Sequence, residues 1–348
     1  MPPHPPVSRS RLTATDALLA RGVDDGIFTH AACCLVRGGE TVWERAFGAA
    51  SLDTLFDLAS LTKPLSTATL VLQLIDGDVL HLTDTLPPLL PSDFGVLPHL
   101  APVTLHHLLT HTSGLPAIPE WPEDGAAVGR DACLRAAFAT PPLRPPGTMY
   151  TYSDAGYILL GELAACAAGQ PLEALFQERI AAPLGLRDTG FRPLPAQFPR
   201  LASTMPSGIP GEVHDPRARD LGGVAGHAGL FGTVTEAAKL AETIRTGGGS
   251  LLSRASALMM QTSQISPSLG GQSLGWFCGG NPFLPSCDLF SPRAFGHSGF
   301  TGTLILIDPA FDFSLVLLTN RVVNTAEDGA RYLRLRRLWL NAVAAALL

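Results

Sequence analysis

Apolar positions along the middle of the chain recur at helical spacing. From Ala59 to Ile75 they fall every three or four residues, and Asp76-Gly77 supplies a stop. A Pro-rich, mostly helical region follows to about residue 220, and Thr233-Val-Thr-Glu236 is a capping box that opens a helix toward Ile244. Further helices are predicted over residues 12–21, 105–109, 157–168, 172–180 and 326–348.

Apolar runs near the two ends of the chain predict strands instead. Residues 31–37 and 40–46 flank Gly38-Gly39, which fits a two-residue hairpin turn. Residues 303–308 and 313–318 flank a second turn. The order of elements predicts an α/β fold, in which an antiparallel sheet is flanked by N- and C-terminal helices. We expect a sheet domain over residues 1–58 and 222–348, an inserted all-helical lobe over 59–221, and a site in the cleft between them.

Composition narrows the class of protein. Of the 348 residues, 46% are hydrophobic and 16% are charged, and the net charge of −6 shows no basic nucleic-acid footprint. No apolar stretch of about 18 residues predicts a membrane span. The first ten residues lack a secretory pattern, so we expect a cytoplasmic protein. The six cysteines are expected to be free thiols, with a bridge between Cys278 and Cys287 as the alternative.

Lysine is nearly absent from this chain. Among its 24 basic residues, 22 are arginine and only Lys63 and Lys239 are lysine. Arginine keeps its proton in proteins, whereas a lysine in suitable surroundings can lose it. A lysine retained in such a background is therefore a candidate for a position where arginine cannot replace it.

Ser60-Leu-Thr-Lys63 opens the first long predicted helix. Residues three apart share one face of a helix, so the hydroxyl and the amine can meet. The first turn also offers free backbone N–H groups to developing negative charge. Serine needs a neighbouring base to act as a nucleophile, and a lysine desolvated enough to be neutral can be that base.

Two later segments complete a pattern. Tyr152-Ser-Asp154 and Gly296-His-Ser-Gly-Phe300 follow Ser60-x-x-Lys63 in the order that is typical of serine β-lactamases and penicillin-binding proteins. The sequence resembles this superfamily, most closely the class C β-lactamase-like serine hydrolases, which include esterases, D-peptidases and amidases. The resemblance covers nearly the whole chain. Supporting stretches are Leu55-Phe-Asp-Leu-Ala-Ser60, His107-Leu-Leu-Thr-His-Thr-Ser-Gly-Leu115, Pro183-Leu-Gly-Leu186 and Leu317-Leu-Thr-Asn-Arg321.

The resemblance implies a role for each residue. Ser60 would form the acyl-enzyme, and Lys63 and Tyr152 would share the proton handling, with either as the base. Backbone N–H groups of Ser60 and Phe300 would form the oxyanion hole. Neither a cofactor nor a metal is implied. The substrate site would be lined by Asp154, His297, Ser298 and Gly299, and Arg321 would either add positive charge there or form a structural salt bridge.

Two departures bear on the substrate. Asp154 stands where the family commonly has asparagine, and an ionised carboxylate donates no hydrogen bond. His297 replaces the usual lysine and is mostly neutral at pH 7. Both favour an esterase, peptidase or amidase acting on a small ester, peptide or muropeptide-like molecule over a true β-lactamase. A non-catalytic penicillin- or muropeptide-binding protein on the same scaffold is a further alternative.

Other readings of the motifs fail. Gly296-His-Ser-Gly-Phe300 lacks the last glycine of a nucleophile elbow, and His297 is the last histidine, whereas that fold needs a histidine after its serine. His107 and His111 are four apart but lack the glutamate of a zinc-protease helix, so no metal is expected. The sequence does not indicate an oligomeric state.

Overall fold

The computed structural model describes residues 7–90, 94–205, 208–285, 288–324 and 329–347. Its main sheet has five antiparallel strands in the order β2-β1-β8-β7-β6. The first hairpin turns through Gly38-Gly39, both at positive φ, which confirms the predicted two-residue turn. The second hairpin is confirmed as well. The strands are β1 (His30–Arg37), β2 (Glu40–Gly48), β6 (Phe295–Ser298), β7 (Leu304–Asp308) and β8 (Phe313–Thr319).

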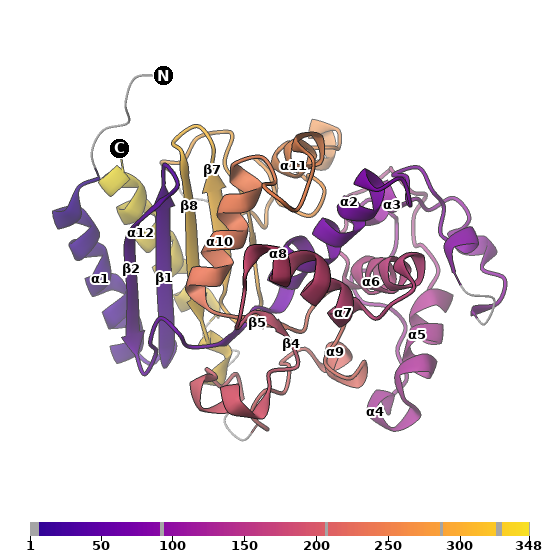
Figure 1. Ribbon diagram of the computed structural model, residues 1–348, viewed down its shortest axis with the longest axis horizontal. Helices are drawn as coiled ribbons and strands as arrows, with labels where there is room; N and C mark the ends of the chain where they lie inside the picture. Colours follow the sequence, from indigo (N-terminus) through magenta and orange to yellow (C-terminus); the bar gives the residue numbers. More distant parts are fainter. Residues whose placement is uncertain (1–6, 91–93, 206–207, 286–287, 325–328, 348) are drawn as a thin grey trace.

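Helices cover both faces of this sheet, which explains why its inner strands are apolar throughout. Helices α1 (Arg9–Asp24) and α12 (Gly329–Leu347) pack together on one face, and α10 (Val234–Arg245) lies on the other (Figure 1). Side chains of β1 alternate between two cores. Ala31, Cys33 and Leu35 join the core under α1 and α12, whereas Ala32, Cys34 and Val36 join the core that continues into the helical lobe.

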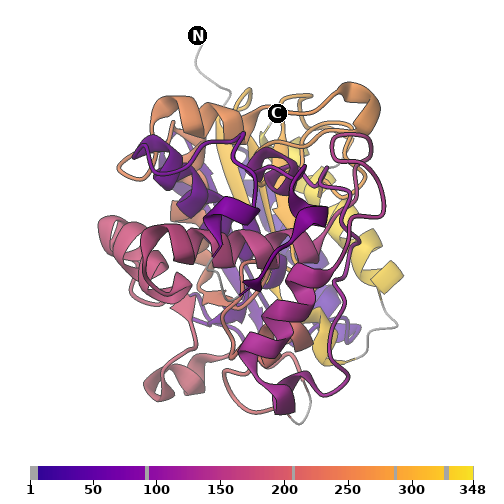
Figure 2. The same ribbon diagram turned by 90° about the vertical axis from the view of Figure 1, so that its right-hand side faces the viewer.

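The helical lobe lies to one side of the sheet, and Figure 2 views the molecule from that side. A three-stranded sheet in the order β3-β5-β4 is found in addition to the predicted strands. Its strands are β3 (Phe56–Asp57), β4 (Gly190–Phe191) and β5 (Leu230–Gly232). The remaining helices are α2 (Thr69–Asp76), α3 (Leu105–Leu109), α4 (Gly125–Val128), α5 (Arg130–Ala139), α6 (Asp154–Ala168), α7 (Leu172–Phe176), α8 (Ala182–Leu184), α9 (Pro216–Asp220) and α11 (Arg254–Gln261).

The predicted helix from Ala59 to Ile75 is not one regular α-helix. It consists of a 3₁₀ turn over Ala59–Leu61, a π-helical segment over Lys63–Ala68, and α2. Pro64 has no N–H with which to bond the carbonyl of Ser60, so the regular ladder cannot form there. The hydroxyl of Thr69, the first residue of α2, donates to the Pro64 carbonyl at 2.8 Å.

The predicted capping box at Thr233 is only half correct. The Thr233 hydroxyl accepts the Glu236 N–H, as expected. The Glu236 carboxylate does not return to Thr233, because it accepts instead from the amides of Arg187 and Asp188 and the hydroxyl of Thr189. This glutamate therefore ties the segment before β4 to α10.

Some predictions fall partly outside the residues that the structure describes. Five cysteines, Cys278 among them, are free thiols, and Cys287 lies outside the described residues. Residues 326–328 and 348 of the predicted closing helix also lie outside them. The division at residues 58 and 222 stays a prediction. Within the described ranges no single helix is long and apolar enough to cross a bilayer. The bent pair Asp154–Ala168 and Leu172–Leu184 reaches that length and apolar composition only when its two parts are taken together.

Candidate functional site

A strained turn presents Ser60. The preceding residue, Ala59, has a φ of 48°, a conformation that costs a residue with a side chain about 1 kcal/mol or more. The buried Asp57 carboxylate holds this turn, because it accepts the Ala59 N–H at 2.8 Å and the His214 N–H at 2.7 Å. Burial raises the pKa of Asp57 to about 6, although both amides work the other way.

Lys63 lies behind Ser60 with no exposed surface. Its Nζ donates to Ser60 Oγ at 3.0 Å and to the His227 carbonyl at 3.0 Å, and it lies 2.7 Å from Asp154 Oδ1. Three oxygens therefore surround the nitrogen, as many as an ammonium has N–H groups. Burial disfavours the charge, but Asp154 and Tyr152 outweigh it and raise the pKa of Lys63 to about 12. Of the two bases that the sequence leaves open, these surroundings favour Tyr152 over Lys63 in the free protein.

Tyr152 lies beside both of these residues. The ring centroid is 4.9 Å from Lys63 Nζ, and the hydroxyl interacts with Ser60 and Lys63. The ring packs against His111 at 4.6 Å and Phe277 at 5.6 Å. Burial raises the pKa of Tyr152, and the charge of Lys63 opposes that rise. The tyrosine is therefore held in place by aromatic packing, with its hydroxyl directed at the nucleophile.

A pair formed by an aspartate and a histidine adjoins the site and was not predicted as part of it. Asp215 Oδ1 lies 2.8 Å from His227 Nε2, and the backbone carbonyl of the same His227 accepts from Lys63. Burial would raise the pKa of Asp215, but His227 and the Ala218 amide outweigh it and hold it well below its usual range. The sequence signals for this pair were His227 within the Gly-rich stretch of residues 222–229 and Asp215 within His214-Asp-Pro216.

A cavity of 570 Å³ opens onto Ser60 and collects most of the predicted residues. Predicted residues in its wall are Ser60, Tyr152, Asp154, Ser298, Gly299, Phe300 and Arg321. Lys63 is buried behind the wall. Arg321 forms no ion pair among the described residues, so the structural salt bridge is not found. Its guanidinium instead lies 4.9 Å from the ring centroid of Phe300.

His297 does not line this cavity, and that expectation is wrong. Its side chain is fully buried, and its ring stacks on Phe277 with a centroid distance of 4.1 Å. Burial and the nearby charge of Lys63 hold its pKa well below the usual range. His297 therefore supports the aromatic cluster around Tyr152 as a neutral ring and supplies no charge to a ligand.

Gly299 brings the end of β6 against the nucleophile turn. A Cβ added there would lie 2.2 Å from Thr303 Oγ1, 2.7 Å from the Leu58 carbonyl and 3.1 Å from Ala59 Cβ. Only glycine permits this approach. The next residue, Phe300, donates its N–H to no backbone group in the described part of the chain, so this N–H is available near Ser60.

The histidines considered as metal ligands have other contacts. His111 is buried, and its Nδ1 accepts the Ser153 N–H at 3.0 Å. His107 Nδ1 contacts the Thr104 hydroxyl at 3.0 Å. Among the described residues no group of three or more histidine, cysteine or acidic side chains could hold a metal ion.

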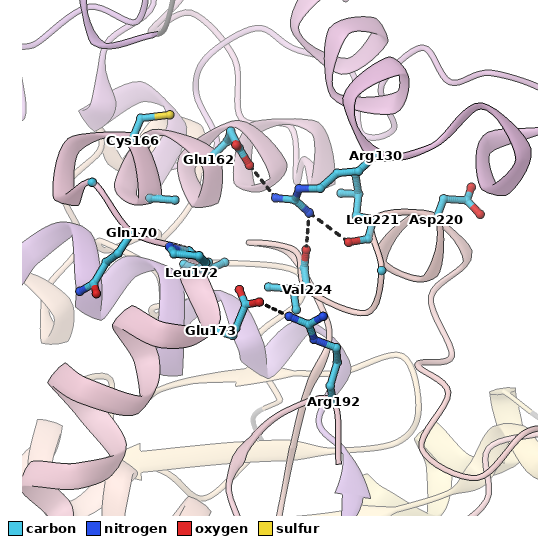
Figure 3. A pocket seen from close by; sticks show the side chains of 14 residues that line it. Arg130, Glu162, Cys166, Gln170, Leu172, Glu173, Arg192, Asp220, Leu221 and Val224 are labelled. Carbon is cyan, nitrogen blue, oxygen red and sulfur yellow. Dashed lines mark hydrogen bonds and ion pairs between the residues drawn. The ribbon is translucent and has the colours of Figure 1, made fainter. Parts of the chain in front are cut away.

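A larger cavity of 760 Å³ lies in the helical lobe, away from Ser60. Figure 3 shows that its two arginines face acidic partners, Arg130 with Glu162 and Arg192 with Glu173. Arg130 also donates to the carbonyls of Leu221 and Val224. The charges here are satisfied within the protein, and Arg130 fixes the segment that leads to His227.

Comparison with known proteins agrees with this fold. The Beta-lactamase family model matches residues 15–338. A relative from Escherichia coli K12, named "Putative D-alanyl-D-alanine carboxypeptidase", is 31% identical over 91% of this chain and 84% of its own length. One from Salmonella agona with the same name is 31% identical over 78% of this chain and 70% of its own length.

Solved structures share the fold. EstCE1, described as a hydrolase with promiscuous acyltransferase activity, superposes with a TM-score of 0.77 at 24% identity, over 95% of this chain and 98% of its own. Simvastatin synthase (LovD) from Aspergillus terreus gives 0.77 at 21% identity, over 96% and 98%. The chain therefore belongs to the beta-lactamase family, as the resemblance predicted. It is a serine hydrolase.

Proposed function

We propose that the chain hydrolyses its ester or amide substrate through an acyl-enzyme on Ser60. The carrying observation is the environment of Lys63, whose buried Nζ lies within 3.0 Å of three oxygens, one of them Ser60 Oγ. An ammonium held so close to a serine hydroxyl favours the alkoxide that develops during attack. A non-catalytic binding protein has no need of this costly buried charge.

Tyr152 is the proton acceptor in this scheme. Lys63 is already protonated and Asp154 is engaged by it, so Tyr152 relays the proton. As Ser60 gives its hydroxyl proton to the Tyr152 oxygen, Tyr152 gives its own hydroxyl proton to the leaving group. The adjacent ammonium stabilises the negative charge that develops on the Tyr152 oxygen during this relay. Ser60 Oγ attacks the carbonyl carbon, and the Ser60 and Phe300 amides bind the oxyanion. Water then attacks the acyl-enzyme through the same relay. It gives a proton to the Tyr152 oxygen, and Tyr152 returns its hydroxyl proton to Ser60 Oγ as the acid is released.

A carboxylate-bearing peptide or ester is the proposed substrate. The relatives named as carboxypeptidases support a peptide with a free carboxylate. Because His297 is neutral and buried, Arg321 in the cavity wall would bind that carboxylate. Asp154 offers no amide hydrogen to a β-lactam carbonyl, so we place true β-lactamase activity second. We also propose a cytoplasmic location, where recycled muropeptide fragments and small esters are available.

Intact-protein mass spectrometry tests the proposal. Wild type and Ser60→Ala are incubated with a fluorophosphonate and, separately, with a penicillin. A single fluorophosphonate adduct confined to wild type is expected, and a stable penicilloyl adduct would support a peptidase-like substrate. Rapid penicillin turnover would favour the β-lactamase, and no adduct with either reagent would overturn the proposal in favour of a binding protein.

A further inference from the structure

Three arginines from separate segments lie in the wall of the Ser60 cavity. Arg217 comes from α9, Arg321 follows β8, and Arg336 comes from α12. Arg321 and Arg336 flank the ring of Tyr332, with guanidinium carbons 5.5 Å and 6.0 Å from its centroid. Ser60 lines the same cavity, so the three positive charges adjoin the nucleophile.

None of the three guanidiniums has an ion-pair partner among the described residues. The two carboxylates of the same cavity are already engaged, Asp154 by Lys63 and Asp215 by His227. Arg217 Nε is buried and has no hydrogen-bond partner. By contrast, Arg130, Arg192, Arg200, Arg219 and Arg245 each have a carboxylate partner.

Partial burial makes this arrangement costly for the free protein. Burial lowers the pKa of Arg321, and the charge of Arg336 lowers it further. Burial also lowers the pKa of Arg336. Like charges that are partly desolvated and lack counter-ions disfavour the folded state. A bound anion would relieve this repulsion, since guanidinium groups bind carboxylates in bidentate geometry.

We propose that Arg217, Arg321 and Arg336 together form an anion subsite for two carboxylates of the substrate. One is the carboxylate already assigned to Arg321, and the other is a second carboxylate that the subsite selects. The inference rests on the proposed function and narrows its substrate to dicarboxylates. One guanidinium suffices for one carboxylate, whereas three without internal partners match a group with at least two negative charges. The cavity of 570 Å³ has room for such a group beside the reacting carbonyl.

Ester selectivity provides the test. Nitrophenyl esters of butyric, succinic and tricarballylic acid carry zero, one and two free carboxylates. For wild type we expect kcat/KM to rise along this series. In Arg336→Gln and Arg217→Gln the ratio of tricarballylate to succinate ester should fall about tenfold. Arg334→Gln, an exposed arginine on the same helix, should keep the wild-type ratio. Equal ratios in all four proteins would overturn the subsite.

Direct binding separates failure of the subsite from failure of the proposed function. Calorimetric titration of tricarballylate into wild type should show binding that weakens at least tenfold in Arg336→Gln and also weakens with added salt. Binding without ester turnover or Ser60 labelling would refute the proposed function and leave the subsite standing. Turnover without tricarballylate binding would refute the subsite alone.

Discussion

The carboxylate of Asp154 lies 2.7 Å from the ammonium of the fully buried Lys63. At this position the family commonly has an amide, so the ion pair is a departure from the family pattern. The pair stabilises the fold across the neutral range. The raised pKa of Lys63 means that its contribution is lost only as pH rises through about 12. The lowered pKa of Asp154 means that its contribution is lost as pH falls.

Asp154→Asn should therefore destabilise the protein and change its pH profile. Removal of one partner of a buried ion pair is expected to lower the free energy of unfolding by about 3 kcal/mol at pH 7 in a urea titration. Without the carboxylate the pKa of Lys63 falls, so the alkaline limb of kcat/KM should move to lower pH. Arg192→Gln, which breaks a more exposed ion pair, should cost less than about 1 kcal/mol. An unchanged alkaline limb in Asp154→Asn would refute the role of this pair.

Lys63→Arg should be nearly inactive although the positive charge is kept. The buried Nζ site holds a compact ammonium among three oxygens, and a planar guanidinium cannot occupy it without displacing Ser60. We expect kcat/KM for a nitrophenyl ester to fall by about 10³-fold. Lys239→Arg changes the other lysine, which is exposed on α10, and should retain full activity. Activity near wild type in Lys63→Arg would contradict the mechanism.

Gly299→Ala should separate the end of β6 from the nucleophile turn. The added Cβ would meet the Leu58 carbonyl and Thr303 Oγ1 at distances that no packed atom tolerates. We expect a loss of stability of about 1–3 kcal/mol and acylation slower by about 10²-fold, since the oxyanion amides shift. Gly190→Ala has open space around its Cβ and should change neither. Unaltered acylation in Gly299→Ala would argue against the proposed oxyanion hole.

Asp57 should make stability depend on pH in the direction opposite to the usual carboxylate. Its pKa is raised to about 6 in the folded protein, so the folded state holds the proton more tightly. Its contribution is full below pH 4 and is lost as pH rises through 6, by about 3 kcal/mol in all. We expect the free energy of unfolding of wild type, less that of Asp57→Asn, to fall as pH rises from 4 to 6 in parallel urea titrations. A flat difference would show that Asp57 is not strained by burial.

The two terminal hairpins were predictable because each depends on a local pattern. Ser60 and Lys63 were candidates from their spacing, and Tyr152 was assigned through the family resemblance. Gly38-Gly39 fixes its turn, and spacing alone places Lys63 beside Ser60. The pairing of Asp215 with His227 was not predictable, because it depends on how a loop folds back over α6. The burial of His297 was missed for a similar reason: its stacking on Phe277 is a tertiary contact. The charge state of Lys63 likewise depends on Asp154, which is remote in sequence.

The sheet order sets a condition on how the chain folds. Strand β1 pairs with β2 on one side and with β8 on the other, and nearly 280 residues separate β1 from β8. During synthesis the first hairpin therefore waits with one apolar edge open until residues 313–319 emerge. Loop closure over so long a separation makes folding slow. We expect the isolated N-terminal half to aggregate and to depend on chaperones, whereas the complete chain closes its own sheet.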